Sequence, residues 1–179
     1  PTVEIIARMF AVMACYDDHD PASVAHVWED YMPRLNDGVE GVRIGLPKNY
    51  FFEDLAPGID EAVRAAAGKL ASAGAVLSDI ELEGAEDTLE AIMPMVWADC
   101  YEFHKERAEQ RPEMFGKDVL DRILLGRDVS GSDYAAALRC RERWNRVVQR
   151  ALGEVDVILT PTTPLPAPRI SESSDMLSI

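Results

Sequence analysis

The chain has 179 residues, of which 47 % are hydrophobic, and its formal net charge is −14. This length can bury roughly 70 % of the unfolded surface in one core, so we expect residues 1–179 to form one domain or part of one, ending in a polar tail at 171–179. The acidic balance argues against nucleic acid as a partner, because phosphates need a cationic surface. The arginines between Arg139 and Arg150 are interpreted as a solvated helix flank.

Location is predicted from two further features of the composition. No run approaches the ~18–20 apolar residues of a membrane span, and the N-terminus lacks a basic region followed by an apolar signal core. The odd set of widely spaced cysteines, with no C-x-x-C pair, favours a reducing compartment. We therefore expect a cytoplasmic protein without a membrane partner. The cysteines are Cys15, Cys100 and Cys140.

The first elements in chain order are a helix and a strand. Thr2 can cap a helix whose apolar positions from Val3 to Met13 step by three and four residues, with an end near Cys15-Tyr16. After a loop, residues 42–46 have the pattern of a short strand that Pro47 stops.

A βαβ unit follows from this first strand. Helical spacing begins at Ile59, and Gly74 occupies the position of a left-handed C-cap. A second strand is predicted at 75–80. Strand, helix and strand in this order predict a parallel pair.

The rest of the chain is predicted to be mostly helical. Residues 84–128 form helices that Pro94 and Pro112 interrupt, and Ser130-x-x-Asp133 can act as a capping box for a helix that ends at Gly153. That helix is predicted to be apolar along one face, with Trp144 nearby. The face consists of Tyr134, Leu138, Val148 and Leu152.

A third strand, Val157 to Leu159, is fully apolar, which suits a strand covered on both faces. It must stop at Thr160, because the prolines that follow cannot donate to a ladder. Alternating helices and short strands indicate an α/β fold, and three strands are few for so much helix. The sheet is therefore predicted to be incomplete. The prolines are Pro161, Pro164, Pro166 and Pro168.

The residues themselves provide no complete catalytic constellation. A zinc site needs three or four converging ligands, whereas Cys100 and His104 have no second cluster, and His19 and His26 lie on either side of Pro21. The Ser173-Ser174 pair lies in the polar tail without an activating base. We therefore expect no metal, no cofactor and no catalytic residue in this chain.

Four segments, in order, give the chain a resemblance to the C-terminal part of the amidase-signature family. "TVEIIARMFAVMACYDDHDPAS" (2–23) resembles the helix after the signature core. "GVRIGLPKNYFFEDLAPGIDEAV" (41–63) resembles the family's Arg-Ile-Gly strand and Tyr-Phe loop. "LLGRDVSGSDYAAALRCRERW" (124–144) resembles a later helix, and "DVILTPTTPLPAP" (156–168) resembles the Thr-Pro-Thr-Thr-Pro ending.

The resemblance implies a mixed β-sheet covered by helices on both faces, and hydrolysis of carboxamides by Ser–cis-Ser–Lys chemistry in the complete protein. The glycine- and serine-rich segment that carries this chemistry in the family does not occur in the 179 residues. This chain alone is therefore expected to be inactive and to shape the fold and the pocket. The residues expected near the amide substrate are Thr160, Thr162 and Thr163.

Two alternatives stay open. The loop at 50–52 resembles the A subunit of glutamyl-tRNA amidotransferase, whereas the helix at 130–144 resembles general amidases, which we favour. The other alternative is a non-catalytic structural or interaction module. In either case the uncovered apolar strands require a partner, which is the missing N-terminal catalytic half or a second copy.

Overall fold

A computed structural model describes residues 2–20, 22–26 and 29–169 of the chain. It divides into two compact units, Pro1–Glu40 and Gly41–Ile179. The predicted polar tail and its serine pair lie outside the described residues.

The first unit contains the predicted N-terminal helix. Helix α1 (Val3–Met13) begins after Thr2, whose Oγ1 accepts a hydrogen bond of 3.3 Å from the backbone N–H of Ile5. This cap confirms the predicted start, while the end comes two residues before Cys15. A short 3₁₀ helix, η1 (Met32–Arg34), follows in the same unit.

The second unit is built on a parallel sheet of three strands, β1 (Arg43–Pro47), β2 (Val76–Ile80) and β3 (Val157–Ile158). The strand order is β2-β1-β3, and β1 is parallel to both neighbours. Helix α2 (Ile59–Ser72) connects β1 to β2, and Gly74 beyond it has a φ of +98°. The predicted βαβ unit and its glycine C-cap are confirmed.

The prediction that the third strand is covered on both faces is wrong. Val157 is 46 % exposed, and its neighbour Ile158 is only partly buried. The reason is the strand order, because β3 lies at an edge of the described sheet and pairs there with β1 alone.

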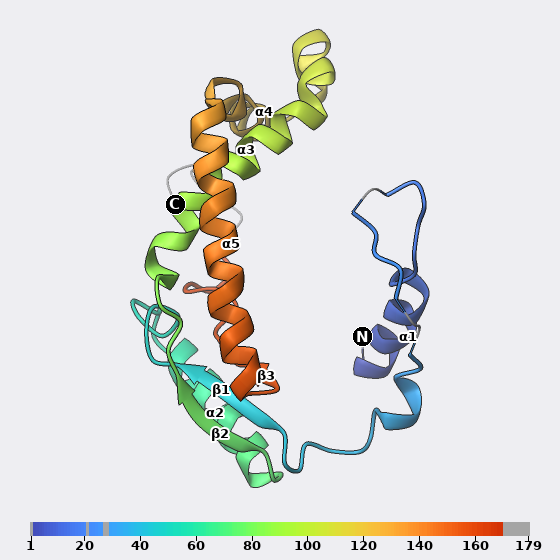
Figure 1. Cartoon of the computed structure of the whole chain (residues 1–179), viewed down its shortest axis with the longest axis vertical. Coiled ribbons are helices and arrows are strands. Elements are labelled where there is room, and N and C mark those ends of the chain that lie inside the picture. The colour runs from blue at the N-terminus through green and yellow to red at the C-terminus, as the bar shows by residue number, and fades with distance from the viewer. Residues whose placement is uncertain (1, 21, 27–28, 170–179) are drawn as a thin grey trace. The chain divides into compact units, whose positions relative to one another are not determined.

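The prediction that Pro94 interrupts the helical region is also wrong. Helix α3 (Ala85–Gln110) continues through Pro94, although a proline inside a helix costs about 3 kcal/mol. Packing of α3 along α5 (Gly131–Glu154) offsets this cost, and the two helices run side by side in Figure 1. Pro112 does mark an end, since it opens η2 (Pro112–Met114) directly after α3. Two further elements, α4 (Lys117–Leu124) and η3 (Leu125–Asp128), lead to α5.

Helix α5 begins as predicted, because the backbone N–H of Asp133 donates to Ser130 Oγ over 3.2 Å. Its buried face differs from the predicted one. The residues buried are the small side chains Ala137, Cys140 and Ala151, whereas Leu152 is 45 % exposed. Small side chains allow α5 and α3 to approach closely. The prediction was wrong because it assigned the large apolar side chains to the buried face.

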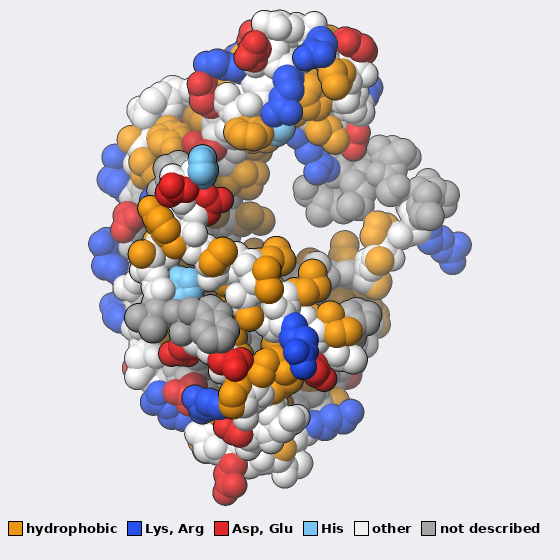
Figure 2. Space-filling model, turned by 90° about the vertical axis from the view of Figure 1, so that its right-hand side faces the viewer, with side chains coloured by type: hydrophobic (Ala, Val, Ile, Leu, Met, Phe, Trp, Pro, Cys, Tyr) orange, Lys and Arg blue, Asp and Glu red, His pale blue; other side chains and the backbone are white. Residues whose placement is uncertain are grey.

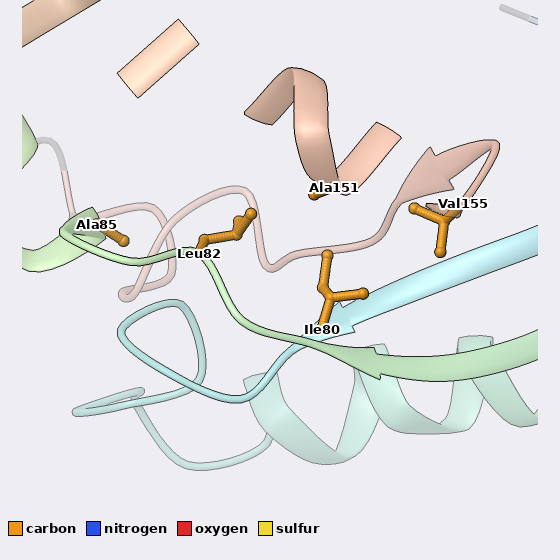
Figure 3. Packing of buried hydrophobic residues seen from close by; sticks show 5 residues of the cluster. All are labelled: Ile80, Leu82, Ala85, Ala151 and Val155. Carbon is orange, nitrogen blue, oxygen red and sulfur yellow. The ribbon is translucent and has the colours of Figure 1, made fainter. Parts of the chain in front are cut away.

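The core of the second unit lies between the sheet and the C-terminal end of α5. Its side chains point toward one another from β2, the start of α3 and the end of α5, while α2 covers the opposite face of the sheet (Figure 3). The unit is thus the predicted α/β fold with a small sheet, whose described pairings are all parallel. The core residues are Ile80, Leu82, Ala85, Ala151 and Val155.

Within the described part of the chain, no helix combines the length and hydropathy needed to cross a bilayer.

Candidate functional site

Two loops meet beyond the carboxyl ends of β1 and β3. The backbone N–H of Ala56 donates to the carbonyl oxygen of Pro164 over 2.9 Å, which joins the loop after β1 to the loop after β3. Between them lies a cavity of about 500 Å³, here called the loop cleft. In open α/β sheets, ligands bind outside the carboxyl ends of the strands. The cleft is lined by Tyr50, Phe51, Glu53, Asp54, Leu55, Pro161, Thr162, Thr163, Pro164 and Leu165.

Asn49 anchors the first loop to the sheet. Its Nδ2 donates to the carbonyl oxygen of Leu82 over 3.0 Å, and its Oδ1 accepts from the N–H of Leu82 over 3.1 Å. The Asn49 side chain therefore pairs with both backbone groups of Leu82, as a residue of a neighbouring strand would. The start of the loop is fixed relative to the core, because Leu82 is only 2 % exposed.

The first loop continues in a constrained conformation. Tyr50 has a φ of +61° and Asp54 a φ of +49°, values that residues other than glycine adopt uncommonly. The N–H of Tyr50 donates to Glu53 Oε1 over 2.8 Å, and the Tyr50 and Phe51 rings meet edge to face with centroids 5.1 Å apart. Both rings pack against the core, so this wall of the cleft is rigidly supported.

The second loop contains the threonines predicted from the sequence. Thr162 and Thr163 line the cleft, whereas Thr160 does not. The hydroxyl of Thr163 donates to the carbonyl oxygen of Leu165 over 2.9 Å, which leaves its lone pairs free. The hydroxyl of Thr162 is exposed and forms no hydrogen bond within the described residues. It is therefore available to a ligand as donor and acceptor.

The sequence did not indicate that the loop at 50–55 forms the opposite wall. A signal was present, because this loop directly follows a predicted parallel strand, and ligand sites gather at such ends. What the sequence could not provide was the strand order, which places β3 beside β1.

The chemistry of the cleft suits binding rather than covalent catalysis. Its walls combine aromatic and proline rings with hydroxyls and the carboxylates of Glu53 and Asp54. A nucleophilic serine needs an adjacent base. Among the described residues no serine hydroxyl contacts a lysine or histidine side chain, and Lys48 pairs with Asp79 at 3.2 Å.

A larger cavity, of about 670 Å³, lies between the start of α3 and α5, and contains none of the predicted threonines. Arginines on its α5 side extend into solvent, as the interpretation of a solvated flank implies; they include Arg143, Arg146 and Arg150. We favour the loop cleft as the functional site, because two strand ends converge there and its aromatic wall is anchored to the core.

Neither residue pair considered as a metal site is joined, as a pair, by a third ligand side chain in the described part of the chain. Neither Cys100 with His104 nor His19 with His26 belongs to a group of three ligand side chains among residues 2–20, 22–26 and 29–169. The group that does exist is Asp17, Asp18 and His19, consecutive and exposed in a turn, where the His19 ring approaches Asp18 at 2.9 Å. An exposed acidic turn of this kind is explained by solvation alone.

Outside the cleft, two tyrosine hydroxyls donate to carboxylates. Tyr134 donates to Asp99 over 2.9 Å and Tyr101 donates to Glu109 over 2.6 Å. These hydrogen bonds raise the pKa of both phenols above the ordinary value of 10.0. Higher pKa values make both phenols poorer proton donors. The Tyr134–Asp99 hydrogen bond joins α5 to α3, whereas the Tyr101–Glu109 bond lies within α3.

Comparison with known proteins places the chain and its fold in a family. The model of the Amidase family matches residues 1–178. An amidase of Pseudomonas putida is 36 % identical over 171 residues, which are 96 % of this chain and 37 % of that protein. The A subunit of glutamyl-tRNA(Gln) amidotransferase from Nitrosococcus oceani is 32 % identical over 198 residues, covering 97 % of this chain and 41 % of that one.

Solved structures agree with this assignment. A structure of a vestigial protein complex, described as revealing the evolutionary origins of an s-triazine catabolic enzyme, aligns over 94 % of this chain and 36 % of its own, with a TM-score of 0.83 and 26 % identity. The 6-aminohexanoate cyclic dimer hydrolase, at 19 % identity, shows the same fold over 96 % of this chain and 38 % of its own, with a TM-score of 0.77.

The α/β fold is therefore that of the amidase-type enzyme family. The chain belongs to the Amidase family, the amidase-signature enzymes. It spans about two fifths of the length of the curated relatives it matches.

Proposed function

We propose that this chain forms part of an amide hydrolase, in which the loop cleft contributes one wall of the substrate pocket. The observation that carries this proposal is the convergence of two anchored loops at the carboxyl ends of β1 and β3, in a chain of the Amidase family. Thr162 and Thr163 would contact the substrate, and Thr160 would lie near it where β3 ends.

The covalent chemistry would come from polypeptide outside these 179 residues. A serine there would attack the carboxamide carbon, while a second serine and a lysine transfer its proton to the departing nitrogen, as the family resemblance implies. Ammonia would leave first, and water would then release the carboxylic acid. The chain described above supplies binding and shape, without a cofactor.

The test is the release of ammonia from simple carboxamides. We expect none from the purified 179-residue chain, and release by a full-length enzyme that includes it. Ammonia release by this chain alone, lost when one of its own serines is replaced by alanine, would overturn the proposal.

A second candidate is supported by the relative named as the A subunit of glutamyl-tRNA(Gln) amidotransferase, at 32 % identity. In that case the enzyme would transfer the ammonia to an acceptor instead of releasing it. Amide hydrolysis by the full-length enzyme without any other protein favours the hydrolase. Activity that requires both a partner protein and an acceptor favours the amidotransferase.

We also propose that further polypeptide or a second copy covers part of this chain, and that the protein is cytoplasmic. Hydrophobic side chains reach the surface at many places on the face in Figure 2, and large ones such as Val3 and Phe103 are more than half exposed. All three cysteines are free thiols, as expected in a reducing compartment. A non-catalytic interaction module would share these features, and the ammonia assay separates it from the enzyme.

A further inference from the structure

The loop cleft is charged with one sign only. Glu53 and Asp54 follow β1 and lie exposed at the cleft, and no lysine, arginine or histidine is among the described residues that line it. A ligand in the cleft therefore meets two carboxylates without a neutralising cation on its walls.

The loop holds the Glu53 carboxylate in place by a hydrogen bond. Glu53 accepts the N–H of Tyr50 with Oε1 at 2.8 Å, which leaves Oε2 for other contacts. Asp54 has a left-handed backbone conformation with a φ of +49°, which determines the direction of its Cα–Cβ bond.

The nearest cations in sequence are engaged elsewhere. Lys48 pairs with Asp79 at 3.2 Å. Arg64 binds Asp60 at 2.7 Å and lies 4.8 Å above the centre of the Phe52 ring. Neither lines the cleft, so the negative charge of Glu53 and Asp54 is not cancelled by these groups.

The remainder of the cleft is apolar. The edge-to-face rings of Tyr50 and Phe51 form one wall, and the other contains Pro161, which is buried, and Leu165, which is half exposed. Aromatic walls with a few fixed polar groups suit a compact apolar or aromatic body.

From these observations we infer that the cleft selects amides whose body is aromatic or apolar and neutral or cationic, and rejects amides that carry a carboxylate. This inference rests on the proposed function, because it names the substrate class of the same site. Two exposed carboxylates near a bound anionic amide should lower kcat/KM for that amide about tenfold at low ionic strength. The effect should shrink in high salt, which screens exposed charges.

The kinetic experiment compares three phenylacetamides that differ only in a para methyl, aminomethyl or carboxylate group, using the full-length enzyme. We expect kcat/KM for the carboxylate compound to be about tenfold below that for the methyl compound in low salt, and about threefold below it in roughly 0.5 M NaCl. The aminomethyl compound should equal or exceed the methyl compound.

Variants assign the effect to the cleft. Asp54→Asn keeps a residue type that tolerates positive φ and should raise kcat/KM for the carboxylate compound about threefold relative to kcat/KM for the methyl compound. Glu53→Gln keeps an acceptor for the Tyr50 N–H and should act similarly. Glu90→Gln, which removes an exposed carboxylate of α3 outside the cleft, should change neither rate. Circular dichroism verifies that each variant is folded.

A binding experiment separates the inference from the proposed function. The three phenylacetamides are titrated into the 179-residue chain, and NMR monitors the backbone amides at 50–55 and 162–163. Equal or better use of the carboxylate compound overturns the charge selection and leaves amide hydrolysis standing. Selectivity that survives Asp54→Asn and Glu53→Gln together also overturns it. If the full-length enzyme hydrolyses none of the compounds but the chain binds the methyl compound selectively at these loops, the proposed function is overturned and the charge selection stands.

Discussion

Asp156 and Arg43 are joined by hydrogen bonds of both their side chains and their backbones. Asp156 Oδ1 accepts from Arg43 Nη2 over 2.7 Å, and its Oδ2 accepts from the Arg43 backbone N–H over 2.8 Å. Arg43 Nη1 also donates to the carbonyl oxygen of Glu154 over 2.8 Å, and the Asp156 N–H donates to the Arg43 carbonyl over 2.9 Å. One ion pair therefore fixes the entry to β3 against the start of β1.

These contacts predict a pH dependence of stability. Hydrogen bonds from Arg43 lower the pKa of Asp156 below its ordinary value of 3.8. The stabilisation is therefore fully present above pH 3.8 and is lost as the pH falls through the lower pKa of the folded state. Asp156→Asn should be less stable than wild type at neutral pH, and the difference in urea midpoint should narrow toward about pH 3.

The control for this titration is Glu90→Gln, because Glu90 forms no hydrogen bond or ion pair within the described residues. Its stability at neutral pH should lie within about 0.5 kcal/mol of wild type. A midpoint difference for Asp156→Asn that stays constant from neutral to acidic pH would contradict the role assigned to the ion pair.

Asn49 provides a second prediction at this scale. Asn49→Ala leaves the N–H of Leu82 without its partner, whereas the Leu82 carbonyl still accepts from the N–H of Ala85 over 3.1 Å. An unsatisfied buried polar group costs about 1–3 kcal/mol. We expect a loss of that size in the free energy of unfolding, measured with urea. Asn145→Ala, at an exposed position of α5 without a hydrogen bond in the described structure, should change it by less than about 0.5 kcal/mol.

At the scale of elements, Gly126 in η3 determines how closely that turn approaches α3. A Cβ at this position would lie 2.6 Å from the Cβ of Tyr101 and would overlap the backbone carbonyl of Trp97. Neither atom is the end of a flexible side chain, so the helix itself would have to move.

Gly126→Ala should therefore destabilise the protein by about 3 kcal/mol or more, because overpacking at backbone contacts forces main-chain shifts. Gly68→Ala is the matched control. Nothing lies within 4 Å of its Cβ in the interior of α2, and we expect a gain of about 0.5–1 kcal/mol. Urea unfolding of both variants tests the pair, and equal losses would refute the assigned packing.

The elements that the sequence predicted well are those with local signals. The caps at Thr2 and Ser130, the glycine at 74 and the parallel βαβ unit depend on neighbouring residues. The predicted interruption at Pro94 and the predicted buried face of α5 were wrong, because both features depend on packing between helices that are distant in sequence.

The candidate site was predictable only in half. The family resemblance pointed to Thr160, Thr162 and Thr163, and the last two line the loop cleft. Their partners around Tyr50 depend on the pairing of β3 with β1, for which no local pattern exists. The carboxylates of Glu53 and Asp54 look like ordinary solvation in so acidic a chain until the cleft brings them together.

At the scale of the whole molecule, the first unit by itself leaves α1 with no buried residue. Val3, Val12 and Met13 are 69 %, 76 % and 73 % exposed, and exposed apolar surface of this kind marks an interface. The chain's short coverage of its relatives fits a surface that further polypeptide covers.

We therefore expect the isolated chain to associate with itself as its concentration rises, as followed by analytical ultracentrifugation. Val12→Lys with Met13→Lys should weaken this association by roughly tenfold or more, since two charges would have to be desolvated. Asn36→Lys with Asn145→Lys adds the same charge at exposed polar positions and should have little effect. A wild-type chain that is monomeric at every concentration would argue against α1 as an interface.

The pairing of Arg43 with Asp156 also bears on how the chain is made. The two residues are 113 positions apart, while β2 follows β1 after a single helix. During synthesis β1 can pair with β2 early, but its other edge stays open until almost the entire second unit has been translated. An open strand edge is a template for wrong pairing, so nascent chains halted before Asp156 should be the ones that chaperones bind and proteases remove.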